Sequence, residues 1–172
     1  MEAFLKSNIS KINKSYLLHI QFGKKIDKSI FDNRLNETTV KNLMKNLQNQ
    51  KHSFKTYNQT IYYYDNIYLK YNNSNGSSSI HSFKQEISKS FPHDKKLDLN
   101  FSILNILDTP CPESVYNYNN IERKEIIVYD LSLFNLELSK LNDHYAIKII
   151  IKKPNKYEDI LSLIHKIINY LN

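Results

Sequence analysis

The chain has 172 residues, 41% of them hydrophobic and 24% charged, which fits one domain over residues 1–172 and excludes wholesale disorder. Its formal net charge of +7 favours an anionic partner such as RNA, although A/T-rich codons would enrich lysine in the same way. The single cysteine, Cys111, excludes an internal disulfide and a zinc finger built from neighbouring cysteines.

The first predicted elements are a strand and a short helix. Over residues 16–22 two sets of side chains alternate: Tyr16, Leu18, Ile20 and Phe22 on one face and Leu17, His19 and Gln21 on the other. This period of two predicts a strand, which Gly23 is expected to end. A short amphipathic helix is predicted from Asn36, a favourable N-cap. Its core face would consist of Val40, Leu43, Met44 and Leu47.

The middle of the chain is rich in β-forming residues. Strands are predicted over 54–56, 60–64, 67–71 and 80–87. The polar run 72–79 contains Asn75-Gly76, which suits the tight turn of a hairpin. Several tyrosines are expected as half-buried sheet residues, with stacking on RNA bases as the alternative; they are Tyr62, Tyr63, Tyr64, Tyr68 and Tyr71.

The last third of the chain predicts three more strands, over 97–103, 125–134 and 144–152, with the stretch 135–142 left ambiguous. A final amphipathic helix is predicted to open at Pro154-Asn155, with Glu158 in a capping-box arrangement. About seven strands with two helices and no βαβ alternation favour an antiparallel barrel or a strongly curved sheet.

Four sequence patterns, taken in order, carry a resemblance to a known family. They are LLHIQFG at 17–23, LNFSIL at 99–104, RKEIIVYDLS at 123–132 and YAIKII at 145–150. Together with the terminal helix they resemble the triphosphate-tunnel, metal-dependent RNA triphosphatases of mRNA-capping enzymes from large DNA viruses. The resemblance implies an α+β fold, an antiparallel β-barrel or tunnel of about eight strands, with a helix after the first strand and a C-terminal helix.

The resemblance also implies a reaction, the removal of the terminal phosphate from an RNA 5′ end. In that family, glutamates of the first and last strands hold Mg²⁺ or Mn²⁺, and lysines and arginines inside the tunnel grip the triphosphate. The corresponding positions here are Leu17, His19 and Gln21 in the first strand and Ala146, Lys148 and Ile150 in the last. None of the six is acidic. Because a hard divalent cation requires carboxylate oxygens, we expect no metal site and no catalytic residue.

The leading hypothesis is therefore a non-catalytic, degenerate relative of the RNA triphosphatases. It would be an accessory or structural subunit of a viral transcription or mRNA-capping assembly, with a protein partner, no cofactor and no membrane. Residues 1–14 lack the apolar core of a secretory signal peptide, and no window approaches the roughly 20 apolar residues of a membrane span. We therefore expect an intracellular, reducing compartment, which for a viral protein means the host cytoplasm or the virion.

Two alternatives remain open. In the first, the chain is an active RNA 5′-triphosphatase or other phosphohydrolase that uses Mg²⁺ or Mn²⁺ with relocated acids; Asp98 and Asp130 are the main candidates, beside Asp108 and Glu125. In the second, it is a basic module that binds RNA, triphosphate or another polyanion without chemistry. Its phosphate-binding candidates are Lys70, Lys84, Arg123, Lys124 and Lys148.

Histidine and cysteine offer no stronger site. His19, His81 and His144 are possible bases or ligands, but the histidines show no metal-binding spacing. Cys111 lies between two prolines without an identifiable base, so an inert thiol is expected. Self-association as a structural protein also stays possible on the sequence alone.

Overall fold

The fold was analysed in a computed structural model that describes residues 1–28, 30–64, 67–74, 77–93, 97–107, 120–131, 134–151, 153 and 156–171. Helices flank a set of long strands. In chain order the elements are α1 (Glu2–Asn8), the 3-10 helix η1 (Ile9–Lys11), β1 (Tyr16–Lys25), β2 (Phe31–Asp32), α2 (Glu37–Asn49), β3 (Phe54–Tyr64), β4 (Ile67–Ser74), β5 (Ser77–Pro92), β6 (Asp98–Leu107), β7 (Asn120–Asp130), β8 (Phe134–Leu141), β9 (His144–Ile151) and α3 (Tyr157–Leu171).

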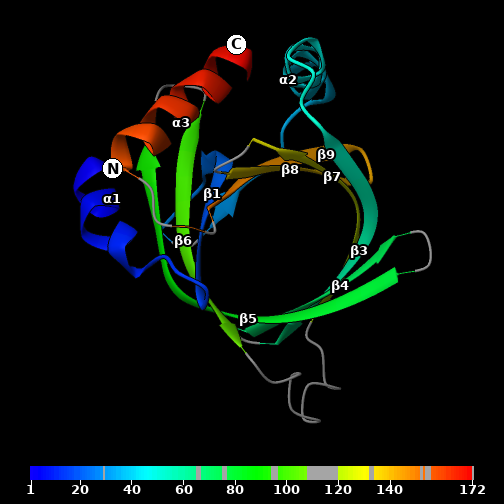
Figure 1. Cartoon of the computed structure of the whole chain (residues 1–172), viewed down its shortest axis with the longest axis horizontal. Helices are drawn as coiled ribbons and strands as arrows, with labels where there is room; N and C mark the ends of the chain where they lie inside the picture. Colours follow the sequence, from blue (N-terminus) through cyan, green and yellow to red (C-terminus); the bar gives the residue numbers. More distant parts are fainter. Residues whose placement is uncertain are drawn as a thin grey trace.

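Eight of the strands form a closed antiparallel barrel, which Figure 1 shows in a view down its axis. The strand order is β1-β6-β5-β4-β3-β7-β8-β9, and pairing of β1 with β9 closes the ring. The two-residue β2 adds only a short pair at the end of β1. The predicted α+β fold is thus confirmed: α2 follows the first strands, and α3 is the C-terminal helix.

The register between the first and last strands fixes which side chains face inward. His19 lies opposite Ile150, and Gln21 lies opposite Lys148. Alternate residues of β1 therefore point to opposite sides of the wall. Leu18, Ile20 and Phe22 face outward and are almost fully buried under the helices.

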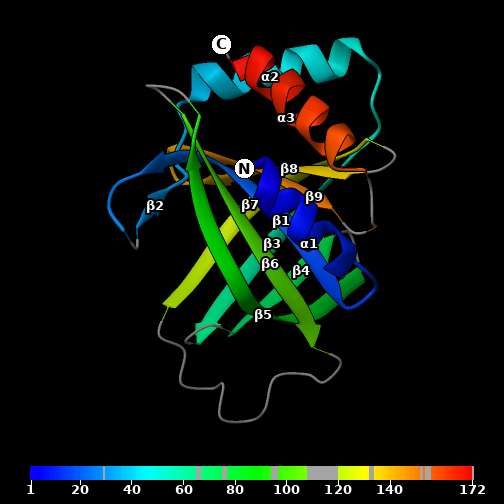
Figure 2. The ribbon, with the colours of Figure 1, turned by 90° about the vertical axis from the view of Figure 1, so that its left-hand side faces the viewer.

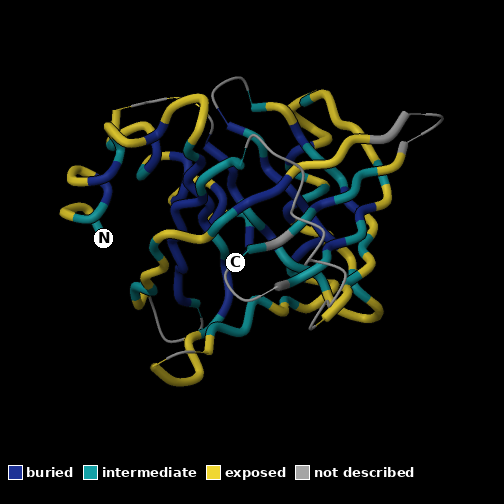
Figure 3. Tube along the Cα trace, turned by 90° about the horizontal axis from the view of Figure 1, so that it is seen from below, coloured by how far each residue is buried: buried dark blue, intermediate teal, exposed yellow. Residues whose placement is uncertain are grey.

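The main hydrophobic core lies outside the barrel, between its wall and the three helices (Figure 2). It joins the outer faces of β1, β6, β8 and β9 to α1, α2 and α3. Helix α3 buries Ile160, Ile164 and Ile167 there. The burial map of Figure 3 shows the long buried stretches running along the strands. No helix among the described residues has the length and apolar content needed to cross a membrane.

A local signal explains helix α2, whereas helix α1 depends on contacts with distant residues. The Asn36 side chain accepts a hydrogen bond of 2.8 Å from the backbone N–H of Thr39, which confirms the predicted N-cap of α2. Helix α1 was not predicted. Its Phe4 packs edge-on against Phe91 and Phe101, with ring centroids 5.6 and 5.9 Å away, so α1 is held by tertiary contacts with β5 and β6.

Several predicted strand boundaries were wrong. Residues 54–56 and 60–64 belong to one strand, β3, and the sheet includes 72–74 and 77–79 of the predicted loop. The ambiguous stretch after residue 134 is strand β8, because its alternating apolar residues pack under the helices. Antiparallel pairing of β4 with β5 confirms a hairpin, but Asn75-Gly76 themselves lie outside the described residues, as do Cys111 and Pro154-Asn155.

Gly23 does not end the first strand, which continues to Lys25. A Cβ atom at this position would lie only 2.1 Å from the backbone oxygen of Asp32. Close approach of the β2 backbone therefore explains why the residue after Phe22 is glycine.

Candidate functional site in the tunnel

The interior of the barrel contains two chambers that share His19 and Lys70 in their walls. The first, of about 230 Å³, we term the basic chamber; it is lined in part by Gln21, Arg34, Glu122, Lys124, His144 and Lys148. The second, of about 450 Å³, we term the apolar chamber; it is lined in part by Leu17, Phe83, Ile106, Val128, Ile150 and Glu137. His19 and Lys70 thus lie where the two chambers adjoin, a place that we term the waist of the tunnel.

All six positions that correspond to the family's first- and last-strand motifs lie in the walls of these chambers. Leu17, His19 and Ile150 line the apolar chamber, while Gln21, Ala146 and Lys148 line the basic chamber. The inward face deduced from strand parity is therefore the observed one. It carries a histidine, an amide, a lysine and three apolar side chains where carboxylates would be required to bind a metal.

A buried ion pair occupies the middle of this wall. Lys148 Nζ donates to Glu137 Oε1 at 3.0 Å, from β9 to the neighbouring β8, and the Glu137 side chain is 4% exposed. Burial alone would raise the pKa of Glu137, but the positive charges of Lys148 and Lys70 outweigh it and lower this pKa to about 2. Glu137 is therefore an ionised carboxylate neutralised by lysines of the chain itself.

The two residues of the waist carry less charge than their types suggest. Burial, followed by the positive charges of Lys148 and Lys70, lowers the pKa of His19 well below its ordinary value, so its imidazole is neutral at pH 7. Burial, followed by the charge of Lys148, lowers the pKa of Lys70 to about 7, although Glu137 opposes this shift. The Lys70 amine is therefore partly deprotonated at neutral pH.

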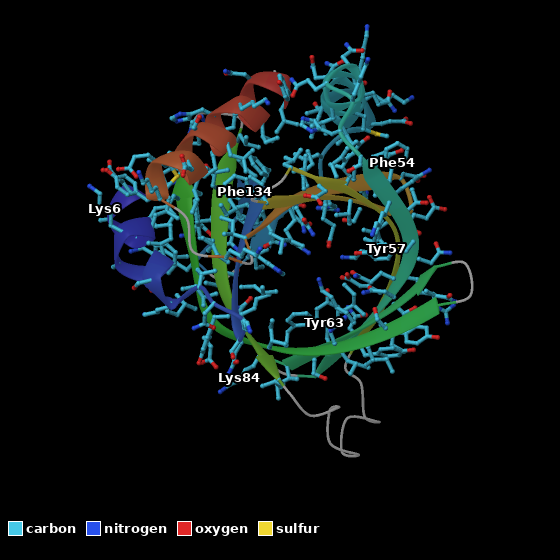
Figure 4. The ribbon with its side chains drawn as sticks, viewed as in Figure 1. Lys6, Phe54, Tyr57, Tyr63, Lys84 and Phe134 are labelled. Carbon is cyan, nitrogen blue, oxygen red and sulfur yellow. The ribbon has the colours of Figure 1, made fainter. Side chains whose placement is uncertain are left out.

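Glu122, another carboxylate that lines the basic chamber, also forms an ion pair. Glu122 pairs with Lys124 at 2.6 Å and accepts a hydrogen bond of 3.0 Å from the Tyr63 hydroxyl. Figure 4 shows Tyr63 and Tyr57 on the inner side of the wall, from opposite ends of β3. Burial and Glu122 raise the pKa of Tyr63, which keeps this phenol protonated as a donor.

Neutral polar groups form a separate network beside the basic chamber. Asn100 donates to Gln21 at 3.2 Å and accepts from Ser88 at 3.2 Å and from Ser90 at 3.0 Å. Ser102 joins the same network. Gln21 thus accepts an amide hydrogen bond from a network that stabilises the wall between β1, β5 and β6.

The residues present do not fit a divalent metal. No group of three or more His, Cys, Asp or Glu side chains that could hold a metal ion occurs in the part of the chain that the structure describes. Among the residues that the structure describes, the carboxylates that line the chambers are Glu122 and Glu137; they belong to different chambers, and each is paired with a lysine. Mg²⁺ or Mn²⁺ bound here would face ammonium groups instead of free carboxylate oxygens.

The predicted phosphate-binding residues fall into two groups. Lys70, Lys124 and Lys148 line the basic chamber together. Lys84 lies on the outer side of the wall, as Figure 4 shows, with its side chain 42% exposed beside Glu86. Arg123 borders a separate depression, lined by the middle of β3, the middle of β7 and the end of β8, instead of the tunnel chambers.

The alternative acids do not converge. Asp98 is buried at the start of β6, where its carboxylate accepts from the backbone N–H of Lys25 at 2.9 Å and pairs with Lys24 at 3.4 Å. Asp130 is exposed at the end of β7, and Glu125 is exposed in the same strand. None of these three lines either chamber in the described part of the chain, and Asp108 lies outside the described residues.

Two features of the site were missed in the sequence. Glu137 was overlooked because the stretch after residue 134 was left ambiguous, although Leu136 and Leu138 alternate with it in the way that places it on the inner face. A small apolar cluster inside the barrel was also missed; its buried members are Leu17, Phe83, Leu104 and Ile150. Strand parity placed Leu17 and Ile150 on the inner face, but it did not predict that they form a cluster with Phe83 and Leu104.

The closed barrel, its partly charged interior and the helices packed outside define the class, a tunnel-type antiparallel β-barrel protein. No family model and no curated protein sequence matches the chain. Several solved structures, however, match the fold of this chain. The RNA triphosphatase domain of a trifunctional Mimivirus mRNA capping enzyme matches with a TM-score of 0.67 at 8% identity, over 99% of this chain and 96% of that chain.

Two further structures share the fold. The Pct1 RNA triphosphatase of S. pombe, solved with the Spt5 CTD, gives a TM-score of 0.65 at 14% identity, over 88% of this chain and 78% of that chain. A chain of the S. pombe Mediator head module gives a TM-score of 0.51 at 8% identity, over 81% of this chain and 84% of that chain. The fold is therefore the triphosphate tunnel of RNA triphosphatases, which confirms the resemblance carried by the four sequence patterns.

Proposed function

We propose that this chain is a non-catalytic relative of the RNA triphosphatases that serves as an accessory or structural subunit of a viral transcription or mRNA-capping assembly. The observation that carries the proposal is the Lys148–Glu137 ion pair on the tunnel wall. It puts an ammonium group where the resembled family has a metal-binding glutamate. We propose that the subunit works inside the cell without a metal cofactor.

Charge explains why this arrangement opposes hydrolysis. Cleaving a triphosphate requires cations that neutralise the phosphoryl oxygens, and in a metal-dependent tunnel Mg²⁺ or Mn²⁺ provides much of that charge. Here the carboxylate of Glu137 is already neutralised by Lys148, and Glu122 by Lys124. Releasing either acid for a metal would leave a largely buried lysine without this partner, which is unfavourable.

Neighbouring structures support the assembly role. The Mediator head module includes a chain with this fold, and Pct1 was solved with the Spt5 CTD. The fold therefore occurs in proteins that contact other proteins. Size fractionation of native extracts should place this chain with RNA polymerase or capping activity, whereas recovery only as the free chain would contradict a subunit role.

The catalytic part of the proposal has a direct test. The purified chain is incubated with γ-labelled triphosphate-ended RNA in the presence of Mg²⁺ or Mn²⁺, and released phosphate is measured. We expect no release above that of buffer. Phosphate release by the wild type that disappears in Lys148→Met would overturn the proposal, because contamination would be insensitive to a tunnel residue.

A second candidate function is anion binding without chemistry. Lys70, Lys124 and Lys148 gather at the basic chamber, and Arg34 lies at its wall although it pairs with Asp32 at 2.7 Å. Triphosphate-ended RNA should then bind more tightly than RNA with a 5′ hydroxyl, and affinity should fall steeply with salt. Lys124→Met should weaken binding, with Lys84→Met as the matched outer control. A flat salt response would exclude this candidate.

A further inference from the structure

Lys70 lies at the waist of the tunnel beside the larger, apolar chamber. Its side chain is buried, with a residue exposure of 6%, and its Nζ lies 5.5 Å from the centroid of the Phe83 ring. Leu17, Ile106 and Ile150 complete an apolar wall around the same space of about 450 Å³. A small molecule in this chamber would therefore have the Lys70 amine within its surroundings.

The groups around this amine keep part of it uncharged. Titratable side chains from five strands of the barrel lie near Lys70: His19, His81, Lys124, Glu137 and Lys148. Lys14, Tyr57 and Lys153 line the same chamber. Burial, then the charge of Lys148, lowers the pKa of Lys70 to about 7, and Glu137 acts in the opposite direction. A lysine amine is nucleophilic only when neutral, and desolvation beside a second cation is a recognised way to produce that state.

We propose that Lys70 is a nucleophilic amine that forms a Schiff base with a small, uncharged aldehyde or ketone bound in the apolar chamber. The neutral Nζ attacks the carbonyl carbon and a C–N bond forms, while one N–H proton moves to the carbonyl oxygen to give a carbinolamine. The second N–H proton then leaves with the hydroxyl group as water, and a C=N bond remains. Amine and carbonyl compound thus give imine and water, without an oxidant or reductant.

Other residues of the waist suit this reaction. The imidazole of His19 is neutral and can accept and return the proton that moves between nitrogen and oxygen. Glu137 remains ionised and stabilises the positive charge that develops on nitrogen. The neighbouring lysines disfavour a cationic ligand. Leu17, Ile106 and Ile150 offer an uncharged ligand an apolar part of the wall, while Lys14, His81 and Lys153 line other parts of the same chamber. The inference goes beyond the proposed subunit role and needs neither triphosphate nor metal.

The test traps the imine in the full-length chain. Benzaldehyde at limiting concentration is added with sodium cyanoborohydride at a series of pH values, and labelled lysines are identified by peptide mass spectrometry. A lysine of pKa about 7 is half neutral at pH 7, against roughly one part in a thousand for an ordinary lysine. We therefore expect Lys70 to be labelled at least about tenfold faster than the exposed Lys84 at pH 7, even after a steric penalty.

Two variants sharpen the result. Lys148→Met removes the neighbouring cation and leaves Glu137 to attract the Lys70 proton, so the pH midpoint of labelling should move upward. Ile106→Trp fills part of the apolar chamber and should slow labelling of Lys70 without changing that midpoint. Circular dichroism checks that both variants fold. The proposal is overturned if wild-type Lys70 is labelled no faster than Lys84 at pH 7, a result that does not depend on either variant.

Discussion

The two faces of the barrel wall differ in composition and in what they do. On the outer side of β1 and β9, Leu18, Ile20, Ile147 and Ile149 are almost completely buried under the helices. On the inner side of the same strands lie His19, Gln21 and Lys148. Because the main core is outside the barrel, the inner residues can change without removing that core. The outer core can therefore support the same tunnel fold whichever side chains the inner face carries.

The largest expected loss of stability comes from a substitution on the outer face of the barrel wall. Phe22→Ala should lower the free energy of unfolding by about 4 kcal/mol, because it removes a fully buried ring and leaves a cavity. Its neighbour on the inner face is the matched control. Gln21→Ala should cost only about 1 kcal/mol, the typical value of one hydrogen bond. Urea denaturation measures both, and equal losses would refute the division between the two faces.

The next largest loss of stability is expected on breaking the Lys148–Glu137 ion pair inside the tunnel. Glu137→Gln should cost about 3 kcal/mol, because Lys148 and Lys70 would lose their buried counter-charge. The double variant Glu137→Leu with Lys148→Met should recover most of this loss, since it removes both members of the pair. Thermal and urea unfolding of the single variants Glu137→Leu and Lys148→Met and of the double variant would test the coupling. A double variant as unstable as the sum of its single changes would contradict it.

Acid should reproduce the loss of this pair. The pKa of Glu137 is lowered from its ordinary value of 4.5 to about 2 in the folded chain, so its stabilising effect is complete above pH 4.5 and disappears as the pH falls towards 2. The expected contribution is up to about 3 kcal/mol. The stability difference between wild type and Glu137→Gln should shrink over this window. A difference independent of pH would show that the ion pair is not its source.

The smallest expected loss of stability comes from the N-cap of helix α2. Asn36→Ala removes the side-chain acceptor for the Thr39 N–H and should destabilise the chain by about 1 kcal/mol. Asn36→Asp keeps an acceptor at the same place and should lose little. Denaturant unfolding distinguishes the two. Equal losses in both variants would mean that the cap hydrogen bond does not contribute.

Alternation made the wall predictable from sequence. Leu18, Ile20 and Phe22 predicted the buried face of β1, and the residues between them predicted the tunnel face. Apolar side chains can bury themselves in only one direction, so a short stretch of sequence is enough. Helix α1 escaped prediction because its position depends on Phe91 and Phe101, far away in the chain.

The interior chemistry was harder to predict because it depends on register between strands. Lys148 and Glu137 face each other only because β8 and β9 pair as they do. The lowered pKa of Lys70 results first from burial and then from the positive charge of Lys148 on β9, while Glu137 on β8 opposes it. Residue type placed these groups on the inner face, but no local pattern revealed which charge would neutralise which.

Closure of the ring by the first and last strands also affects how the chain folds. Leu18 pairs with Ile151, so the β1–β9 seam can form only after all the residues between these two have been synthesised. Contacts between residues so far apart in sequence are slow to form, because a large loop entropy is lost before they contribute stability. Until then β1 has one unpaired edge that can recruit another chain. Slow folding and aggregation of incomplete chains are the kinetic consequences of a barrel built this way.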